Sequence, residues 1–254
     1  MSFETTIKNT WCPGCGNFPL LVAAKQAIEE LEKEGIKKEN IVIVSGIGCH
    51  GKISDYLNLN SVNALHGRGI PVMTGAKLAN EKLEVIGFFG DGDAYAEGIE
   101  HLIHAARRNS NITVLVHNNG VFALTTGQAC PTSKKGFKDH TTPFGNPEEP
   151  LNPVSLMLEA GATFVARGYV AKINHLKNLI KEAVRHKGFS FVDILQPSFV
   201  FNNTFKEYNE KVYEMSEIPK NPSEKAKEKE KIPIGIFHKS AKPVYEDVVR
   251  EIVK

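Results

Sequence analysis

The sequence has few cysteines, no long hydrophobic run and almost no net charge, and each of these absences excludes a class of protein. Four cysteines in 254 residues are too few for a disulfide-stapled framework. No apolar run approaches the ~20 residues that a membrane-spanning helix needs, and a net charge of +2 gives no reason to expect nucleic acid as a partner. The N-terminus lacks the apolar core of a signal peptide, so we expect a cytoplasmic protein without membrane association.

Ordinary composition and alternating patterns predict one large α/β domain. Hydrophobic residues make up 41% and charged residues 24% of the chain, as in common globular proteins. Short apolar runs alternate with segments of helical periodicity, which favours a doubly wound, mainly parallel sheet with helices on both faces. We expect strands at residues 41–44, 62–67, 83–89, 112–116, 163–166 and 189–195.

A strand–helix–strand unit at residues 83–119 carries the most informative polar residues. Its first strand ends in Gly-Asp-Gly-Asp (90–93), and its second leads into Asn118 and Asn119, with 25 residues between Gly92 and Asn118. The carboxyl ends of such strands emerge side by side, so Asp91 and Asn119 could ligate one hard cation. A glycine-rich turn without a ligand is the alternative, which a lone Gly-Asp-Gly would favour.

Two cysteines open the ordered part of the chain in the motif Trp-Cys-Pro-Gly-Cys-Gly-Asn (11–17). Cys12 and Cys15 could face one metal ion or one iron–sulfur cluster. A redox-active dithiol at a helix N-terminus is the competing interpretation. Asn17 is expected to cap the helix that follows and ends near Gly35.

A third cysteine, Cys49, follows the strand at residues 41–44 and lies between glycines, including Gly48. This end of a strand is where ligands collect, although a lone cysteine is more often a buried structural thiol. Lys52 could hold an anionic group, and a solvated lysine is the alternative.

Further polar residues precede and follow the central unit. His66 and Arg68 could approach a phosphate group bound at this edge of the sheet, and a structural role for each is equally expected. Residues 125–152 show little apolar periodicity, and a loop this long in a compact domain is usually functional. Cys130, within this loop, is expected to be a free thiol.

Five motifs together resemble a known family. They are, in chain order, WCPGCGN, GIGCHGK, LHGRGIPVMTGAKLAN, GDGD and NNGVFALTTGQACPTS. The interval from GDG to NN resembles the thiamine diphosphate motif, and the whole set is similar to the β subunits of 2-oxoacid:ferredoxin oxidoreductases. The similarity runs from Cys12 to about Pro219, and it implies a thiamine diphosphate-binding fold.

The resemblance implies roles for individual residues. It assigns Mg²⁺ ligation to Asp91, Asn119 and the Val121 carbonyl. It assigns a [4Fe-4S] cluster to Cys12, Cys15 and Cys49 and makes Lys52 and Leu124 catalytic, Lys52 near the substrate and Leu124 beneath the bent cofactor. The predicted cofactor-binding set is Gly48, Cys49, His66, Gly90, Asp91, Gly92, Asp93, Asn119, Val121 and Leu124.

The sequence departs from the family at Ser198, where the fourth cluster cysteine is expected. Serine is a harder ligand than thiolate. Three outcomes follow: Ser198, solvent or another ligand completes a four-iron site, the site holds a three-iron cluster, or it holds none. We favour a bound cluster because the other three cysteines are all present.

The implied reaction is oxidative decarboxylation of a 2-oxoacid to acyl-coenzyme A and CO₂, with electrons passed through the cluster to ferredoxin. The aminopyrimidine-binding module is not evident in this sequence, so an α subunit should supply it. We expect a thiamine diphosphate domain at residues 1–218 and a charged linker with a C-terminal tail, a surface appendage, at residues 219–254.

Two other functions compete with this one. A non-redox thiamine diphosphate-dependent decarboxylase subunit would account for Ser198. A non-catalytic zinc-binding or scaffold subunit would use the three cysteines but would leave the GDG–NN spacing to chance. The sequence does not single out one 2-oxoacid, since much of the pocket is expected on the partner.

Overall fold

A computed structural model describes residues 3–254 and shows one eight-stranded sheet of order β2-β1-β3-β4-β6-β5-β8-β7. The six strands from β2 to β5 in this order are mutually parallel, and β8 pairs antiparallel with β5. The strands are β1 (Ile41–Ser45), β2 (Asn60–Asn63), β3 (Glu84–Gly90), β4 (Thr113–Asn118), β5 (Phe164–Tyr169), β6 (Ser190–Leu195), β7 (Val212–Glu214) and β8 (Ile232–Lys239). The predicted fold class is confirmed.

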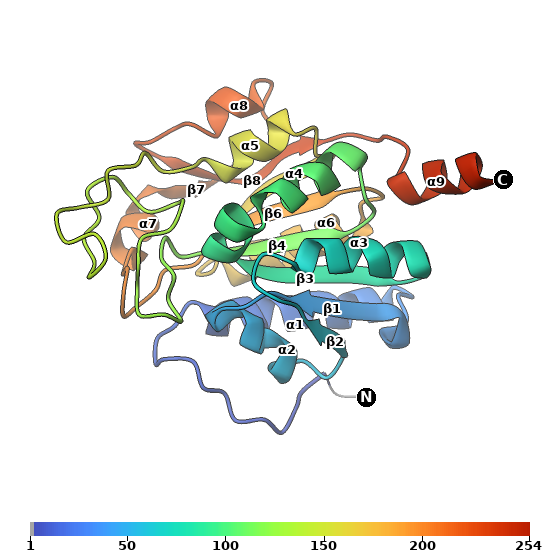
Figure 1. Ribbon diagram of the computed structural model, residues 1–254, viewed down its shortest axis with the longest axis horizontal. Coiled ribbons are helices and arrows are strands. Elements are labelled where there is room, and N and C mark those ends of the chain that lie inside the picture. Colours follow the sequence, from blue (N-terminus) through green and yellow to red (C-terminus); the bar gives the residue numbers. More distant parts are fainter. Residues whose placement is uncertain (1–2) are drawn as a thin grey trace.

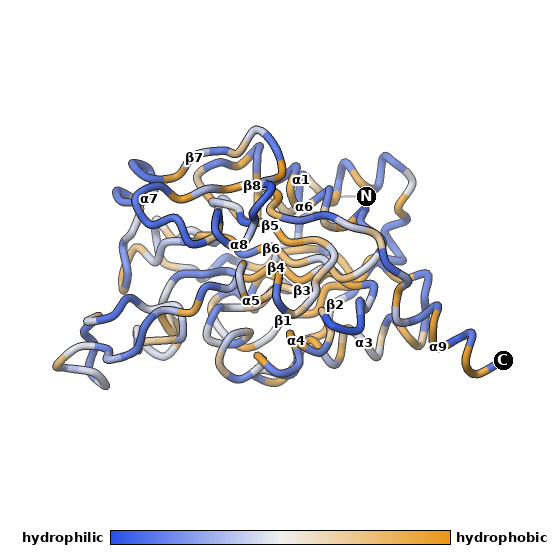
Figure 2. The backbone as a smooth tube through the Cα atoms, turned by 90° about the horizontal axis from the view of Figure 1, so that it is seen from above, coloured by the Kyte–Doolittle hydropathy of each residue, from blue (hydrophilic) through white to orange (hydrophobic). Residues whose placement is uncertain are grey.

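Helices cover both faces of the sheet. In Figure 1, α3, α4 and α5 lie in front of it and α1 and α6 behind it, and Figure 2 shows the same two layers from above. Each face has its own apolar core. The helices are α1 (Asn17–Lys33), α2 (Ile53–Tyr56), α3 (Gly69–Ala79), α4 (Ile99–Arg108), α5 (Pro153–Glu159), α6 (Ile173–Arg185), α7 (Phe205–Lys211), α8 (Pro222–Lys225) and α9 (Tyr245–Val253), with 3₁₀ turns at Lys38–Asn40 and Cys49–Lys52.

The strand register brings four loops to one edge of the sheet. Ser45 of β1 lies beside Phe88 of β3, and Asn118 of β4 lies beside Leu195 of β6. The segments that leave these strands, residues 46–52, 91–98, 119–128 and 196–204, therefore begin next to one another. Buried hydrophobic residues on β1, β3, β4 and β6 fix this arrangement from both faces.

Three local features differ from the expectations. A π-helical turn, Asp93–Glu97, separates β3 from α4. β2 ends at Asn63, and the chain then turns so that the Gly67 amide donates a hydrogen bond to Asp93 at 2.7 Å. Asn17 is not a cap: Gly16 holds that position, and the buried Asn17 side chain contacts His117 Nδ1 at 2.8 Å.

The segment after residue 218 is more than a surface appendage. β8 joins the sheet beside β5, and its Ile234 and Phe237 side chains are fully buried. This segment forms the strand β8 and the helix α9. None of the helices within residues 3–254 is long and apolar enough to cross a membrane.

Candidate active site

A small cavity at the carboxyl edge of the sheet gathers the predicted cofactor residues. It has a volume of about 70 Å³. Every residue of the predicted cofactor-binding set lines it, together with Ile47, His50, Phe122, Ala123 and Thr125. We call it the glycine-lined cavity. The structure thus brings together residues from the loops after β1, β2, β3 and β4, while their binding roles stay predictions.

Asp91 is held at the floor of this cavity by hydrogen bonds from the second half of the motif. Its Oδ2 accepts bonds from the Asn119 amide at 3.0 Å, the Gly120 amide at 2.5 Å and the Thr132 hydroxyl at 2.9 Å. Burial raises the pKa of the Asp91 carboxyl, and the bonds from Gly120 and Thr132 lower it in part. A nearby cation would favour the charged form further.

The turn after β4 presents further oxygen atoms beside Asp91. Asn119 Oδ1 accepts a bond from the Val121 amide at 3.0 Å, and the Asn119 carbonyl accepts one from Asn202 Nδ2 at 2.8 Å. Carboxylate, side-chain amide and backbone carbonyl oxygens are the donor types that suit a hard cation. The donor set of Asp91, Asn119 and Val121 therefore fits Mg²⁺.

Several buried polar atoms near Asp93 have no hydrogen-bond partner within the described chain. They are His50 Nε2, His66 Nδ1 and Asp93 Oδ2, with the two histidine nitrogens 3.5 and 3.7 Å from the Asp93 carboxylate. A methyl group on Gly46 would meet Asp93 Oδ2 at 1.7 Å, so only glycine leaves this space open. Unpaired buried groups are costly, and a polar ligand in the cavity would satisfy them.

A second cavity adjoins the first and holds the three predicted cluster cysteines. It has a volume of about 240 Å³ and is lined by Cys12, Cys15, Cys49 and Ser198. Its apolar walls are Trp11, Ala123, Leu124, Phe199, Val200 and Phe201. We call it the cysteine-lined cavity. Within residues 3–254, no three His, Cys, Asp or Glu side chains converge as a metal-holding group, so the thiols line one space without meeting at a point.

The Cys15 and Cys49 thiols are partly buried, and nearby donors and charge offset part of the effect of burial on their pKa values. Burial raises the pKa of the Cys15 thiol, and backbone and side-chain hydrogen bonds from Asn17 lower it in part. Burial also raises the pKa of Cys49, against which the Lys52 ammonium acts. Three thiols and a buried hydroxyl in one apolar space fit an iron–sulfur cluster with one non-cysteine position.

The predicted catalytic residues lie at the mouth of the cysteine-lined cavity. Leu124 lines both cavities, and its side chain is half exposed. Lys52 lines the cysteine-lined cavity, and its Nζ donates to the Thr10 hydroxyl at 3.1 Å. Arg68, by contrast, contacts His101 at 3.0 Å and does not line either cavity.

Cys130 lies apart from the other cysteines. It is a buried free thiol, 3.3 Å from the Thr132 hydroxyl, and burial followed by the Asp91 charge raises its pKa. It is absent from the lining of the cysteine-lined cavity. Its place in the structure agrees with the expected free thiol.

Sequence reasoning missed Thr132 and Gln196 as site residues. Thr132 binds Asp91 across 41 sequence positions, and Gln196 lies between Asn119 and Cys15. For Gln196 one signal was present, because it directly follows β6 at the edge where ligands collect. Thr132, in a loop without periodicity, gave no such signal.

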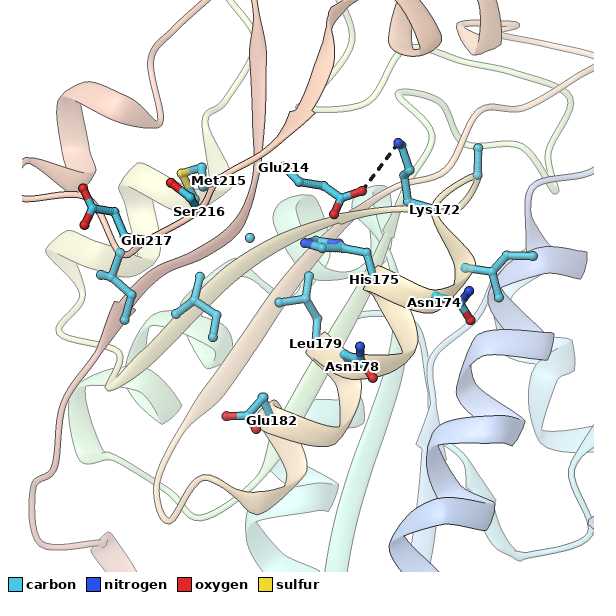
Figure 3. A pocket seen from close by; sticks show the side chains of 15 residues that line it. Lys172, Asn174, His175, Asn178, Leu179, Glu182, Glu214, Met215, Ser216 and Glu217 are labelled. Atoms are coloured by element: carbon cyan, nitrogen blue, oxygen red, sulfur yellow. Dashed lines mark ion pairs between the residues drawn. The ribbon is translucent and has the colours of Figure 1, made fainter.

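The largest cavity, about 790 Å³, lies elsewhere, between the start of α6 and the β7–β8 region. Figure 3 shows His175 and Leu179 of α6 facing Glu214 and Met215, and Lys172 paired with Glu214 at 3.5 Å. No predicted site residue lines this cavity. Its Lys172 and Glu214 side chains pair with each other, so size alone does not make it the active site.

Comparisons with known proteins place the chain in a family. The C-terminal TPP-binding domain of thiamine pyrophosphate enzymes matches residues 46–194, and the C-terminal region of the pyruvate ferredoxin oxidoreductase beta subunit matches residues 197–254. A 2-oxoacid:ferredoxin oxidoreductase subunit beta from Saccharolobus solfataricus is 44% identical, over 91% of this chain and 82% of its own length. The chain belongs to the β subunits of the thiamine diphosphate-dependent 2-oxoacid:ferredoxin oxidoreductases.

Other relatives of this β subunit differ in the substrate that their names give. A 2-oxoglutarate oxidoreductase subunit KorB from Mycobacterium tuberculosis is 44% identical over 76% of the chain and 51% of its own length. A solved 2-oxoglutarate:ferredoxin oxidoreductase from Magnetococcus marinus, with 2-oxoglutarate, coenzyme A and succinyl-CoA bound, superposes with a TM-score of 0.94. It is 35% identical and covers 99% of this chain and 89% of its own. The predicted family and function are confirmed.

Proposed function

We propose that this β subunit holds the diphosphate half of thiamine diphosphate in the glycine-lined cavity and an iron–sulfur cluster in the cysteine-lined cavity. In complex with an α subunit, it would oxidise a 2-oxoacid to acyl-coenzyme A and CO₂ and pass the electrons to ferredoxin. The observation that carries the proposal is that the two cavities adjoin. They share Cys49, Asn119, Ala123 and Leu124, so the site of carbon chemistry borders the site of electron transfer.

Mg²⁺ and the diphosphate would be held by the ends of β3 and β4. Asp91, Asn119 and the Val121 carbonyl would ligate the cation, because these oxygens lie in adjacent turns fixed by hydrogen bonds. His50 and His66 offer unpartnered buried nitrogens that can donate to phosphate oxygens. When bound, thiamine diphosphate supplies the electron sink for decarboxylation and the cluster supplies one-electron transfer.

Lys52 would bind and orient the substrate. Its ammonium is positioned at the mouth of the cysteine-lined cavity, where a 2-oxoacid carboxylate could pair with it. That carboxylate leaves as CO₂, so the ion pair cannot be strongest in the transition state. We therefore assign Lys52 to substrate binding more than to the chemical step, and Leu124 to support of the bent cofactor.

Cys12, Cys15 and Cys49 would provide three cluster ligands, with Ser198 at the fourth position. Ser198 is 8% exposed and lines the same space as the thiols. Its hydroxyl accepts a bond from the Phe201 amide at 3.3 Å, which a ligating serine would have to share or give up.

Free thiols persist in reducing compartments, which supports the cytoplasm as the site of action.

An α subunit would complete the active site. Large apolar side chains near the two cavities are exposed, with Leu65 at 76%, Phe199 at 55% and Val200 at 57%. Exposed apolar patches of this kind mark protein interfaces. The α subunit would bring the aminopyrimidine-binding module, and the isolated β subunit would be inactive.

One observation favours a second function. Ser198, in place of a thiolate, is compatible with a site that holds no cluster, and the subunit would then serve a non-redox 2-oxoacid decarboxylase. The two functions differ in product, because a decarboxylase releases aldehyde without an electron acceptor. They also differ in colour, because only the oxidoreductase contains iron.

The deciding experiment is anaerobic purification of the β subunit alone and with its α subunit. Iron, sulfide and thiamine diphosphate contents and ferredoxin reduction by pyruvate, 2-oxoglutarate or branched-chain 2-oxoacids would be measured for both. We expect iron in both preparations and ferredoxin reduction by the complex alone. Bound thiamine diphosphate with no iron, and aldehyde as product, would instead establish the decarboxylase. Activity of the isolated β subunit would contradict the need for an α subunit.

A further inference from the structure

Gln196 occupies the boundary between the two cavities. It directly follows β6, and its backbone amide donates to the Asn118 carbonyl at 2.8 Å. Its side chain is only 1% exposed and lines the cysteine-lined cavity. A buried carboxamide needs hydrogen-bond partners for its acceptor oxygen and its two N–H donors. The atoms around Gln196 therefore indicate its role.

The Gln196 carboxamide joins one residue from each proposed cofactor site. Asn119 Nδ2 donates to Gln196 Oε1 at 3.5 Å, and Gln196 Nε2 donates to Cys15 Sγ at 3.8 Å. Nε2 also lies 3.4 Å from the Pro197 carbonyl oxygen. A carbonyl oxygen only accepts, so the nitrogen must face Pro197 and Cys15, and the oxygen must face Asn119.

Gly16 leaves the space that this arrangement needs. A methyl group at Gly16 would lie 2.8 Å from Gln196 Nε2 and 3.0 Å from the Pro197 carbonyl oxygen. The second of these atoms is backbone, so the clash could not be relieved by side-chain rotation alone. The glycine between Cys15 and Asn17 thus allows the loop to close onto Gln196.

We propose that Gln196 is a positioning residue that couples the thiamine diphosphate site to the iron–sulfur site through a directed chain of two carboxamides. This inference rests on the proposed function. When Asn119 Oδ1 binds a cation, Asn119 Nδ2 becomes a stronger hydrogen-bond donor to Gln196 Oε1. The Gln196 carboxamide is polarised in turn, and its Nε2 becomes a stronger donor to the Cys15 sulfur. Linked hydrogen bonds strengthen one another in a buried site.

The expected consequence is that the redox potential of the cluster changes when the thiamine diphosphate site is filled. Hydrogen bonds to cluster sulfurs stabilise the more negative, reduced cluster and raise its potential. Filling the Mg²⁺–thiamine diphosphate site should strengthen the Gln196 donor and raise the potential further. Because Asn17 also donates to Cys15, we expect the Gln196 contribution to be at most roughly tenfold in the redox equilibrium, about 59 mV for one electron.

The test is an EPR-monitored redox titration of the αβ complex, with and without Mg²⁺ and thiamine diphosphate. Gln196→Met keeps the side-chain length but removes all three hydrogen bonds of the carboxamide, and Gln26→Met, on the exposed face of α1, is the matched control. We expect the cofactor-linked rise in potential in the wild type and in Gln26→Met, and its loss in Gln196→Met. Equal shifts in all three proteins, or no shift in the wild type, would overturn the coupling while leaving the proposed function standing.

A second variant separates the coupling from a general structural effect. Gln196→Glu keeps an acceptor for Asn119 but has no donor for Cys15, so it should retain thiamine diphosphate affinity and lose the linked shift. If Gln196→Met failed to fold or lost its iron, the result for Gln196→Glu would decide, and an unchanged linked shift there would overturn the proposal. Complexes without iron in the wild type would overturn both the coupling and the proposed function.

Discussion

The two adjoining cavities are built in opposite ways. The glycine-lined cavity is formed where β3 and β4 end, and the turns there are tied together by hydrogen bonds to the buried Asp91 carboxylate. The cysteine-lined cavity is formed by segments from four distant parts of the chain, with apolar walls and thiols that do not converge within the described residues. One cavity is preformed by hydrogen bonds at the sheet edge, and the other is bounded largely by apolar side chains from loops.

The largest effect should follow from breaking the preformed cavity. Asp91→Ala removes the acceptor of four hydrogen bonds and the proposed cation ligand, so we expect Mg²⁺-dependent thiamine diphosphate binding and activity to fall below detection. The free energy of unfolding should also fall by about 1–3 kcal/mol, since buried donors lose their partner. Calorimetric titration with the cofactor measures the first effect, with the exposed Asp55→Ala as control. Unchanged affinity in Asp91→Ala would show that the cation lies elsewhere.

Loss of a thiol should break only the second cavity. Cys12→Ala, which removes a thiol that lines only the cysteine-lined cavity, should lose most of its iron and all ferredoxin reduction, because three thiol ligands become two, while thiamine diphosphate still binds. Cys130→Ala is the control, since Cys130 is a buried free thiol outside the cysteine-lined cavity. Iron and sulfide analysis, with visible absorbance, checks both variants. Iron lost from Cys130→Ala and retained in Cys12→Ala would contradict the proposed cluster ligands.

Lys52, which lines the cysteine-lined cavity, tests the proposed binding of the substrate carboxylate. Lys52→Ala should raise the KM for the 2-oxoacid roughly tenfold or more, as expected for loss of a charge-assisted contact, with a smaller fall in kcat. Lys33→Ala on the exposed face of α1 should change neither. A fall in kcat with KM unchanged would instead place Lys52 in the chemical step.

A change of one atom at Ser198, from oxygen to sulfur, tests whether this residue is a cluster ligand. Ser198→Cys should bring the iron content to about four per β subunit and raise the cluster potential, because a hard alkoxide stabilises the ferric state more than a softer thiolate does. Iron analysis and redox titration measure both. If the wild type already held four irons at the same potential as the variant, Ser198 would not be a cluster ligand.

The smallest expected effect concerns α1, the helix that follows the Cys12–Cys15 loop. Glu30 of α1 binds Lys177 and Lys181 of α6, and the hydrogen bond from Lys177, followed by that from Lys181, lowers the Glu30 pKa from 4.5 to about 2. A lowered folded-state pKa gives stability that is present above pH 4.5 and is lost as the pH falls toward 2. Glu30→Gln should therefore melt slightly below wild type at neutral pH, with Glu251→Gln as control, and the difference should vanish in acid. A difference that persisted at acid pH would point to packing instead of charge.

The preformed cavity was also the part that the sequence predicted best. Asp91 and Asn119 lie at the ends of strands whose apolar runs are unmistakable, and parallel topology alone brings them together. Thr132 and Asn202 reach the same turns from loops without periodicity, so their contacts depend on tertiary folding that local patterns do not encode. For the same reason the interior place of β8 was missed: its charged upstream linker resembles the start of a solvated tail.

Adjacency of carbon chemistry and electron transfer is the central claim, and one spectrum tests it most directly. The αβ complex, purified anaerobically with thiamine diphosphate and Mg²⁺, would be mixed with a 2-oxoacid in the absence of ferredoxin and frozen for low-temperature EPR. We predict a reduced-cluster signal that appears on substrate addition and is missing in Cys12→Ala. A complex that decarboxylates the 2-oxoacid with iron bound but develops no signal would contradict it.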